Sequence, residues 1–103
     1  MSLNSLDGLY AKYGFGVVLR SEGVSYNIRV MADSFSSESG IDEAVQDEEH
    51  YKVLIRNLKA SGFPIPPKKG DKLITEGRTR NIFAVQPLRY QGEVVEYKLR
   101  TRG

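Results

Sequence analysis

The sequence lacks cysteine altogether, and its only histidine is His50. Disulfide bonds and zinc sites built on cysteine are therefore excluded. No apolar run approaches the roughly 20 residues that a helix needs to cross a bilayer. The opening stretch, MSLNSLDGLY, has neither the basic start nor the long apolar run of a signal peptide. We therefore expect a cytoplasmic protein that does not enter a membrane.

Features that carry catalysis are also scarce. No serine stands in the pattern of a nucleophile elbow, and a single histidine at the edge of a polar stretch is typical of a surface residue. The acidic residues lack the Asp-x-Asp-x-Asp-Gly spacing of a calcium loop. We therefore expect no catalytic residue, no metal ion and no cofactor.

Residues 68–72, Lys-Lys-Gly-Asp-Lys, raise the question of a phosphate-binding loop. Such a loop needs a second glycine, a Ser or Thr after its lysine, and a helix behind it. Here there is one glycine, Gly70, and a strand pattern follows. The two prolines just before, Pro66 and Pro67, have no backbone N–H to offer an anion. The cluster is predicted to be a turn in which Gly70 supplies the permissive backbone.

A length of 103 residues fits one domain, which we expect to span residues 1–103. Apolar residues at the spacing i, i+3, i+4 and i+7 predict a short helix over about residues 5–13, with the face Leu6, Leu9, Tyr10 and Tyr13. The stretch 15–20 and the alternating stretch 24–31 predict a hairpin closed by the loop Ser21-Glu22-Gly23, with Val24, Tyr26, Ile28 and Val30 facing inward.

Four more stretches complete the pattern. Residues 51–60 predict a long strand, and strands are predicted over 72–75, 79–88 and 93–101 with turns at Glu76-Gly77 and Tyr90-Gln91-Gly92-Glu93. No connection has the pattern of a crossover helix, so the strands should run antiparallel. The prediction is a mainly β protein: a small antiparallel sandwich or barrel of about six strands, one short N-terminal helix, and a long mobile loop over residues 34–50. Part of that loop, residues 41–49, has the composition of a short helix.

Charge is segregated along the chain. Residues 34–49 hold six acids and no base, whereas residues 56–103 hold eleven Lys or Arg and four acids, a balance of +7. Such segregation indicates ring assembly, a charged partner, or both. A solvated acidic loop beside a basic sheet face is the alternative.

The layout resembles the small head–tail joining, or head-completion, proteins of lambda-like phages and prophages. The resemblance covers most of the chain: a helix, a hairpin, a long polar loop, a strand, the turn and strand Lys69–Ile74, an aromatic strand with Asn81–Val85, and a basic closing strand. A prophage branch of that family bears the label "ATP-binding sugar transporter-like". The sequence lends no support to that label, because it has no P-loop and no membrane span.

The resemblance implies an antiparallel barrel or sandwich that assembles into a ring, hexameric in the virion, at the neck between head and tail. It implies contacts with head- or portal-side and tail-tube-side proteins, a place in the host cytoplasm and then in the virion neck, and no catalysis. The predicted partner-binding residues are Phe35, Ile41, Glu43, Val45, Asp47, Glu48, Glu49, Arg78, Arg80, Arg89, Lys98, Arg100 and Arg102. The alternative is a small β-barrel that binds nucleic acid through its basic C-terminal half.

Overall fold

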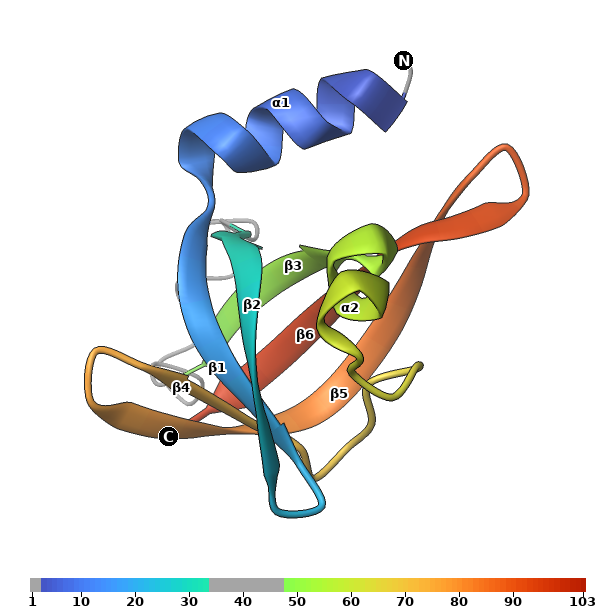
Figure 1. The fold of residues 1–103 in the computed structure, drawn as a ribbon. Coiled ribbons are helices and arrows are strands. Elements are labelled where there is room, and N and C mark those ends of the chain that lie inside the picture. Colours follow the sequence, from blue (N-terminus) through green and yellow to red (C-terminus); the bar gives the residue numbers. More distant parts are fainter. Residues whose placement is uncertain (1–2, 34–47) are drawn as a thin grey trace, which may run out of the picture.

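The computed structural model describes residues 3–33 and 48–103. Within them lie six strands and two helices: α1 (Leu3–Tyr13), β1 (Phe15–Ser21), β2 (Val24–Ala32), β3 (Glu49–Leu54), α2 (Ile55–Ser61), β4 (Lys72–Thr75), β5 (Arg78–Tyr90) and β6 (Glu93–Arg102). The strands form a closed antiparallel barrel in the order β1-β2-β3-β6-β5-β4. Figure 1 shows α1 across one end of the barrel and the β5–β6 hairpin projecting beyond it. The predicted fold class is confirmed.

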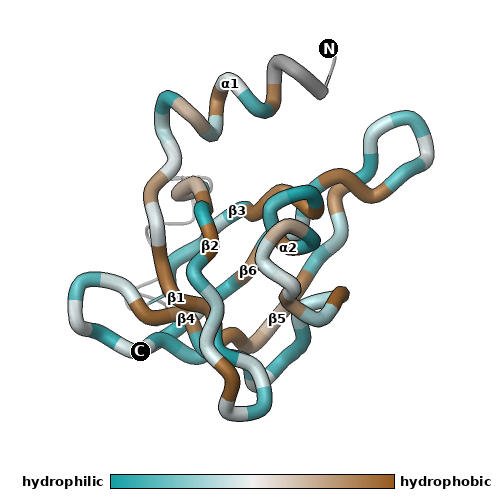
Figure 2. Tube along the Cα trace, in the orientation of Figure 1, coloured by the Kyte–Doolittle hydropathy of each residue, from teal (hydrophilic) through white to brown (hydrophobic). Residues whose placement is uncertain are grey.

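Side chains alternate in direction along each strand, and those that point inward fill the barrel. Val17 and Leu19 of β1, Ile28 and Val30 of β2 and Leu99 of β6 are among the side chains that meet in one buried cluster. Hydrophobic stretches follow the strands, whereas the tips of the β4–β5 and β5–β6 hairpins are hydrophilic (Figure 2). The prediction that placed Val24 inward is wrong, because Val24 lies at the end of the hairpin beyond the barrel wall and is 52% exposed.

Three hairpins share one turn. The pairs Ser21 with Val24, Thr75 with Arg78 and Tyr90 with Glu93 each enclose two residues. The enclosed pairs are Glu22-Gly23, Glu76-Gly77 and Gln91-Gly92, and all six residues have positive φ. Two consecutive positive φ values define a type I′ turn, whose twist matches that of the flanking strands. The first hairpin loop is therefore two residues long, one shorter than predicted.

The predicted strand over residues 51–60 is wrong in its second half. β3 ends at Leu54, and α2 then runs to Ser61 and stops at Gly62, whose φ of 82° is the left-handed conformation that ends many helices. Leu54 and Leu58 stand four residues apart, which is a helical spacing, and Leu58 points into the core. The apolar residues of this stretch fit the repeat of a strand as well as that of a helix, and packing against the core favours the helix.

Helix α2 covers the region where β2 diverges from β3. β2 pairs with β3 through Met31 opposite Lys52 and Ala32 opposite Tyr51. Farther along β2, the ring of Tyr26 meets Phe63 edge-on, with centroids 5.0 Å apart, just behind the C-terminus of α2. The helix and Phe63 thus fill the gap between the two strands with apolar side chains.

Helix α1 starts two residues earlier than predicted and is tied down by polar groups. The guanidinium of Arg29 on β2 donates hydrogen bonds to the carbonyls of Tyr10, Ala11 and Gly14 at the C-terminus of α1, where a cation is favoured. Tyr10 is buried and donates to Glu96 of β6 at 2.7 Å. A Cβ on Gly14 would lie 2.4 Å from the carbonyl oxygen of Tyr10, so a larger residue does not fit there.

Candidate functional site

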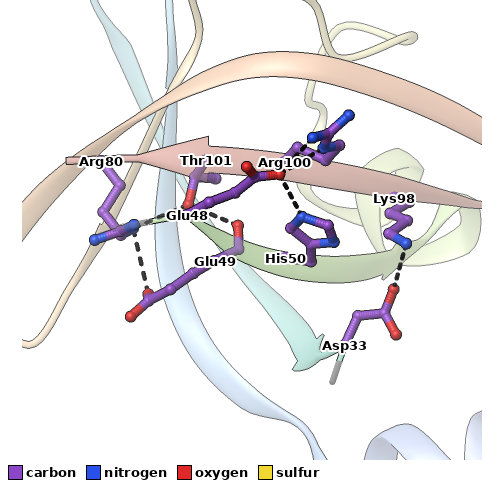
Figure 3. A network of polar contacts seen from close by, with 8 residues as sticks. All are labelled: Asp33, Glu48, Glu49, His50, Arg80, Lys98, Arg100 and Thr101. Carbon is purple, nitrogen blue, oxygen red and sulfur yellow. Dashed lines mark hydrogen bonds and ion pairs between the residues drawn. The ribbon is translucent and has the colours of Figure 1, made fainter. Parts of the chain in front are cut away.

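The connection between β2 and β3 is fastened at both ends to strand β6. We call residues 34–47 the acidic segment; they lie outside the described residues, while their neighbours Asp33 and Glu48 do not. Asp33 pairs with Lys98 at 3.3 Å, and Glu48 accepts hydrogen bonds from Arg100 at 2.6 and 2.7 Å (Figure 3). Lys98 and Arg100 both project from β6, so one strand anchors the two ends of the segment.

A second layer of polar contacts lies beside these anchors. Arg80 of β5, only 1% exposed, donates to the hydroxyl of Thr101 at 2.9 Å and pairs with Glu49 at 3.3 Å. Thr101 in turn donates to the backbone carbonyl of Glu49 at 3.0 Å. The contacts join β3, β5 and β6 around the start of β3. We call the whole set the polar base; it comprises Asp33, Glu48, Glu49, His50, Arg80, Lys98, Arg100 and Thr101.

Electrostatics keeps the polar base in defined charge states. Burial by itself would raise the pKa of Glu48, but hydrogen bonds from His50 and Arg100 outweigh it and hold that pKa below its usual value. Burial of Tyr51, helped by its hydrogen bond to Glu49, raises the pKa of the phenol to about 12. Glu48 is therefore an anion over the physiological range, while Tyr51 remains a neutral donor.

His50 is not the surface residue that its isolation in the sequence indicated. It is 8% exposed, and its Nε2 lies 2.6 Å from a carboxylate oxygen of Glu48. The predicted loop over residues 34–50 is likewise too long at its end, because Glu49 and His50 belong to β3. Strand β3, whose Tyr51 and Val53 are buried, therefore begins within the stretch that was predicted to be a polar loop.

The predicted partner-binding residues divide into three groups. Six of them contact side chains of their own chain: Glu48, Glu49, Arg80, Lys98, Arg100 and Arg102. Two others, Arg78 and Arg89, are exposed. Phe35, Ile41, Glu43, Val45 and Asp47 lie outside the described residues. The prediction that Arg80 binds a partner from the surface is wrong, because its guanidinium lies inside the fold.

The basic outer face of β6 is partly occupied by its own contacts. Phe83 sits at a bulge of β5, where the register shifts between Ile82 and Ala84. The guanidiniums of Arg102 and Arg100 lie over its ring, 4.0 and 5.0 Å from the centroid. A base cannot stack on a ring face that a guanidinium covers, and Lys98 and Arg100 already hold carboxylates. This arrangement gives little support to nucleic-acid binding at this face.

The prediction of a turn at residues 68–72 is confirmed. The N–H of Asp71 donates to the carbonyl of Lys68 at 3.0 Å, and Gly70 has a φ of 101°. The buried carboxylate of Asp71 accepts from the N–H of Lys68 at 3.0 Å and from the hydroxyl of Ser21 at 2.9 Å. The carboxylate therefore links this turn to Ser21 at the end of β1.

A cleft of about 580 Å³ opens beside the polar base. Phe15 and Tyr51 are the aromatic residues that line it, and Glu76 and Arg78 of the β4–β5 hairpin line it as well. Asp33 and Glu48 line it too, so the acidic segment leaves and rejoins the barrel at this cleft. Across residues 3–33 and 48–103, no group of three or more His, Asp or Glu side chains is arranged to hold a metal ion. Neither described helix is long and apolar enough to span a membrane.

Comparisons with known proteins yielded no relative: no family model, no curated protein and no solved structure matches this chain.

Proposed function

We propose that this protein is a structural virion-assembly protein of the head–tail joining kind, which forms a ring at the neck of a phage particle. The observation that carries the proposal is the fastening of both ends of the acidic segment. Asp33 and Glu48, the residues that flank the acidic segment, are held on β6 by Lys98 and Arg100. The closed barrel with α1 across one end agrees with the fold that the resemblance implies.

In this proposal the acidic segment binds the next copy in the ring. Glu43 and Asp47 supply charge, and Phe35, Ile41 and Val45 supply apolar anchors. Arg78, Arg89 and Arg102 are exposed cations for the proteins on either side of the ring, whereas Arg80 and Arg100 are engaged inside the chain. Exposed ion pairs contribute about 0–1 kcal/mol each, so they set register while the apolar anchors hold the contact.

A contact of this kind is head-to-tail: one surface of a copy meets a different surface of the next. Such contacts close into a ring when the rotation between copies permits. The ring assembles in the host cytoplasm and joins a portal-side protein to a tail-tube-side protein, and it performs no chemical step. Its function is mechanical and depends on shape and charge.

The test is completion of particles. A prophage lacking this chain should, on induction, accumulate separate filled heads and tails, and purified protein should restore plaque-forming particles. If the prophage that lacks this chain still yields joined, infectious virions, the proposal fails. Binding of free duplex DNA that weakens steeply with salt would favour the nucleic-acid alternative instead.

The acidic segment is tested separately with Glu43→Gln/Asp47→Gln. This pair is preferable to changes at Glu48 or Glu49, because those two carboxylates stabilise the barrel itself. The double variant should keep the parent melting temperature and lose completion activity. Glu22→Gln/Glu93→Gln, which removes the same charge at two exposed hairpin turns, is the control and should complete normally.

A further inference from the structure

A second groove lies between the two helices and the start of β6, away from the polar base. It has a volume of about 320 Å³ and is lined by Asp7, Leu54, Ile55, Arg56, Lys59 and Val95. Leu54, Ile55 and Val95 make an apolar floor. Arg56, which contacts Asp7 across the two helices, and the exposed Lys59 stand at its rim.

This composition restricts what can fill the groove. An occupant gains free energy by burying apolar side chains on the floor. It must also tolerate two cations at the rim, and Asp7 offsets only one of them. The complement is a short peptide with apolar side chains on one side and carboxylates around them.

The chain itself contains one such peptide. Residues 41–47, Ile-Asp-Glu-Ala-Val-Gln-Asp, place Ile41 and Val45 four residues apart, a spacing that puts both on one face of a helix. Asp42, Glu43 and Asp47 surround them, and no base occurs between residues 34 and 49. Charge and apolar spacing both match the groove.

Reach decides which copy supplies the peptide. The groove begins at Leu54, the last residue of β3, and β3 carries it ~20 Å from Glu48 at ~3.3 Å per residue. Val45 precedes Glu48 by three positions, so it extends at most ~11 Å from that residue. Arg100 holds Glu48 in place. A chain therefore cannot seat its own Val45 in its own groove.

We propose that the groove between α1, α2 and β6 receives residues 41–47 of a neighbouring copy, with Ile41 and Val45 on the apolar floor and the carboxylates against Arg56 and Lys59. The proposal rests on ring assembly as proposed above, and it names the receiving surface. The donor end of each copy, at the polar base, and the receptor end, at the helices, are different surfaces, as a ring requires.

The absence of cysteine allows a clean cross-linking test. Full-length Val45→Cys and a mass-tagged Val95→Cys are mixed at the concentration where the parent assembles, and are then mildly oxidised. A disulfide-linked mixed dimer should form severalfold faster than with Val24→Cys, the exposed control on the β1–β2 hairpin. The double variant Val45→Cys/Val95→Cys should give a ladder of linked copies.

The outcomes separate the two proposals. If parent protein forms rings but the mixed dimer forms no faster than the control, the groove assignment is overturned and ring assembly stands. Linked monomer from the double variant, in place of a ladder, would overturn the assignment too. If no assembly occurs at any concentration or with purified particles, both proposals fail.

Charge at the rim gives a second readout that does not depend on cysteine. Lys59→Glu should weaken self-association by about fivefold, the equivalent of roughly 1 kcal/mol. Adding Asp47→Lys should restore most of that loss, because the pair is reversed. Lys69→Glu, an exposed change of the same charge in the turn before β4, is the control and should leave association unchanged. Equal effects of Lys59→Glu and Lys69→Glu would overturn the assignment.

Discussion

The helical cover and the polar base close the barrel by different means. The helical cover, made by α2 with Leu58 and by Phe63 against Tyr26, fills a gap between β2 and β3 with apolar contact. The polar base closes the region where β3, β5 and β6 meet with ion pairs and hydrogen bonds. The free energy gained from apolar contact depends neither on pH nor on the direction from which the groups meet. Hydrogen bonds and ion pairs instead require the correct charge states, distances and angles.

The two regions should therefore contribute differently to stability and to the positioning of the acidic segment. Most of the free energy of folding should come from the apolar side, because a fully buried side chain contributes about 1.5–3 kcal/mol and a hydrogen bond only about 0.5–1.5 kcal/mol net. The polar base instead positions a particular pair of chain ends, Asp33 and Glu48, where the acidic segment begins and finishes. The following substitutions test that contrast.

Leu58→Ala should have the largest effect. The side chain is 0% exposed, and removing it leaves a cavity beneath α2, so the free energy of unfolding should fall by about 2–5 kcal/mol. Urea unfolding at neutral pH measures this. Leu9→Ala, on the 37% exposed Leu9 of α1, is the control and should cost far less. A loss below that of the control would mean that α2 does not seal the barrel.

Arg80→Ala should cost less, by about 1–3 kcal/mol, because it leaves Thr101 and Glu49 without their buried donor. The matched control is Arg78→Ala, two residues away on the same strand and exposed. Urea unfolding of both variants provides the comparison. Indistinguishable midpoints would show that the polar base contributes nothing to stability.

Gly70→Val tests a position that depends on neither region. A β-branched residue is poorly tolerated at a φ of 101°, so the free energy of unfolding should fall by about 1–2 kcal/mol although open space surrounds the glycine. Gly16→Ala also meets open space, but without a positive φ, and serves as the control for thermal melting. Equal melting temperatures for the two variants would contradict the backbone argument.

The smallest effect should be the acid dependence of Glu48. Its pKa is lowered in the fold from an ordinary value of 4.5, so the stability that it adds is fully present above about pH 4.5. That stability is lost as the pH falls through the lower folded value. Glu48→Gln should therefore cost about 1 kcal/mol or less at pH 7, and should flatten the fall in urea midpoint between pH 5 and 3. A parallel pH profile for parent and variant would exclude this role.

Local pattern sufficed for much of the barrel. The alternation of Val17 and Leu19, and of Tyr97 and Leu99, identifies the inward face of β1 and β6, since side chains on a strand alternate in direction. Glycines at 23, 77 and 92 mark the three type I′ turns, because few other residues accept a positive φ. The antiparallel fold class follows from those short connections.

Helix α2 could not be predicted from the residue pattern alone. The stretch from Tyr51 to Leu58 is apolar at spacings that suit a strand as well as a helix, and a single sequence carries no measure of what lies opposite it. A signal was present in Gly62, which ends the helix, together with the spacing of Leu54 and Leu58. Only the divergence of β2 from β3 requires a helix there.

The sequence by itself determined most strand faces, the places of the turns and the segregation of charge, because these depend on residues within a few positions of one another. Tertiary structure alone decided which charges are buried. Arg100 reaches Glu48 across 52 positions of the chain, and Tyr10 reaches Glu96 across 86. A histidine or arginine is stable inside a protein only when a partner of correct charge and geometry meets it there. Closing the barrel brings those partners together, and it thereby turned His50 and Arg80 from expected surface residues into parts of the fold.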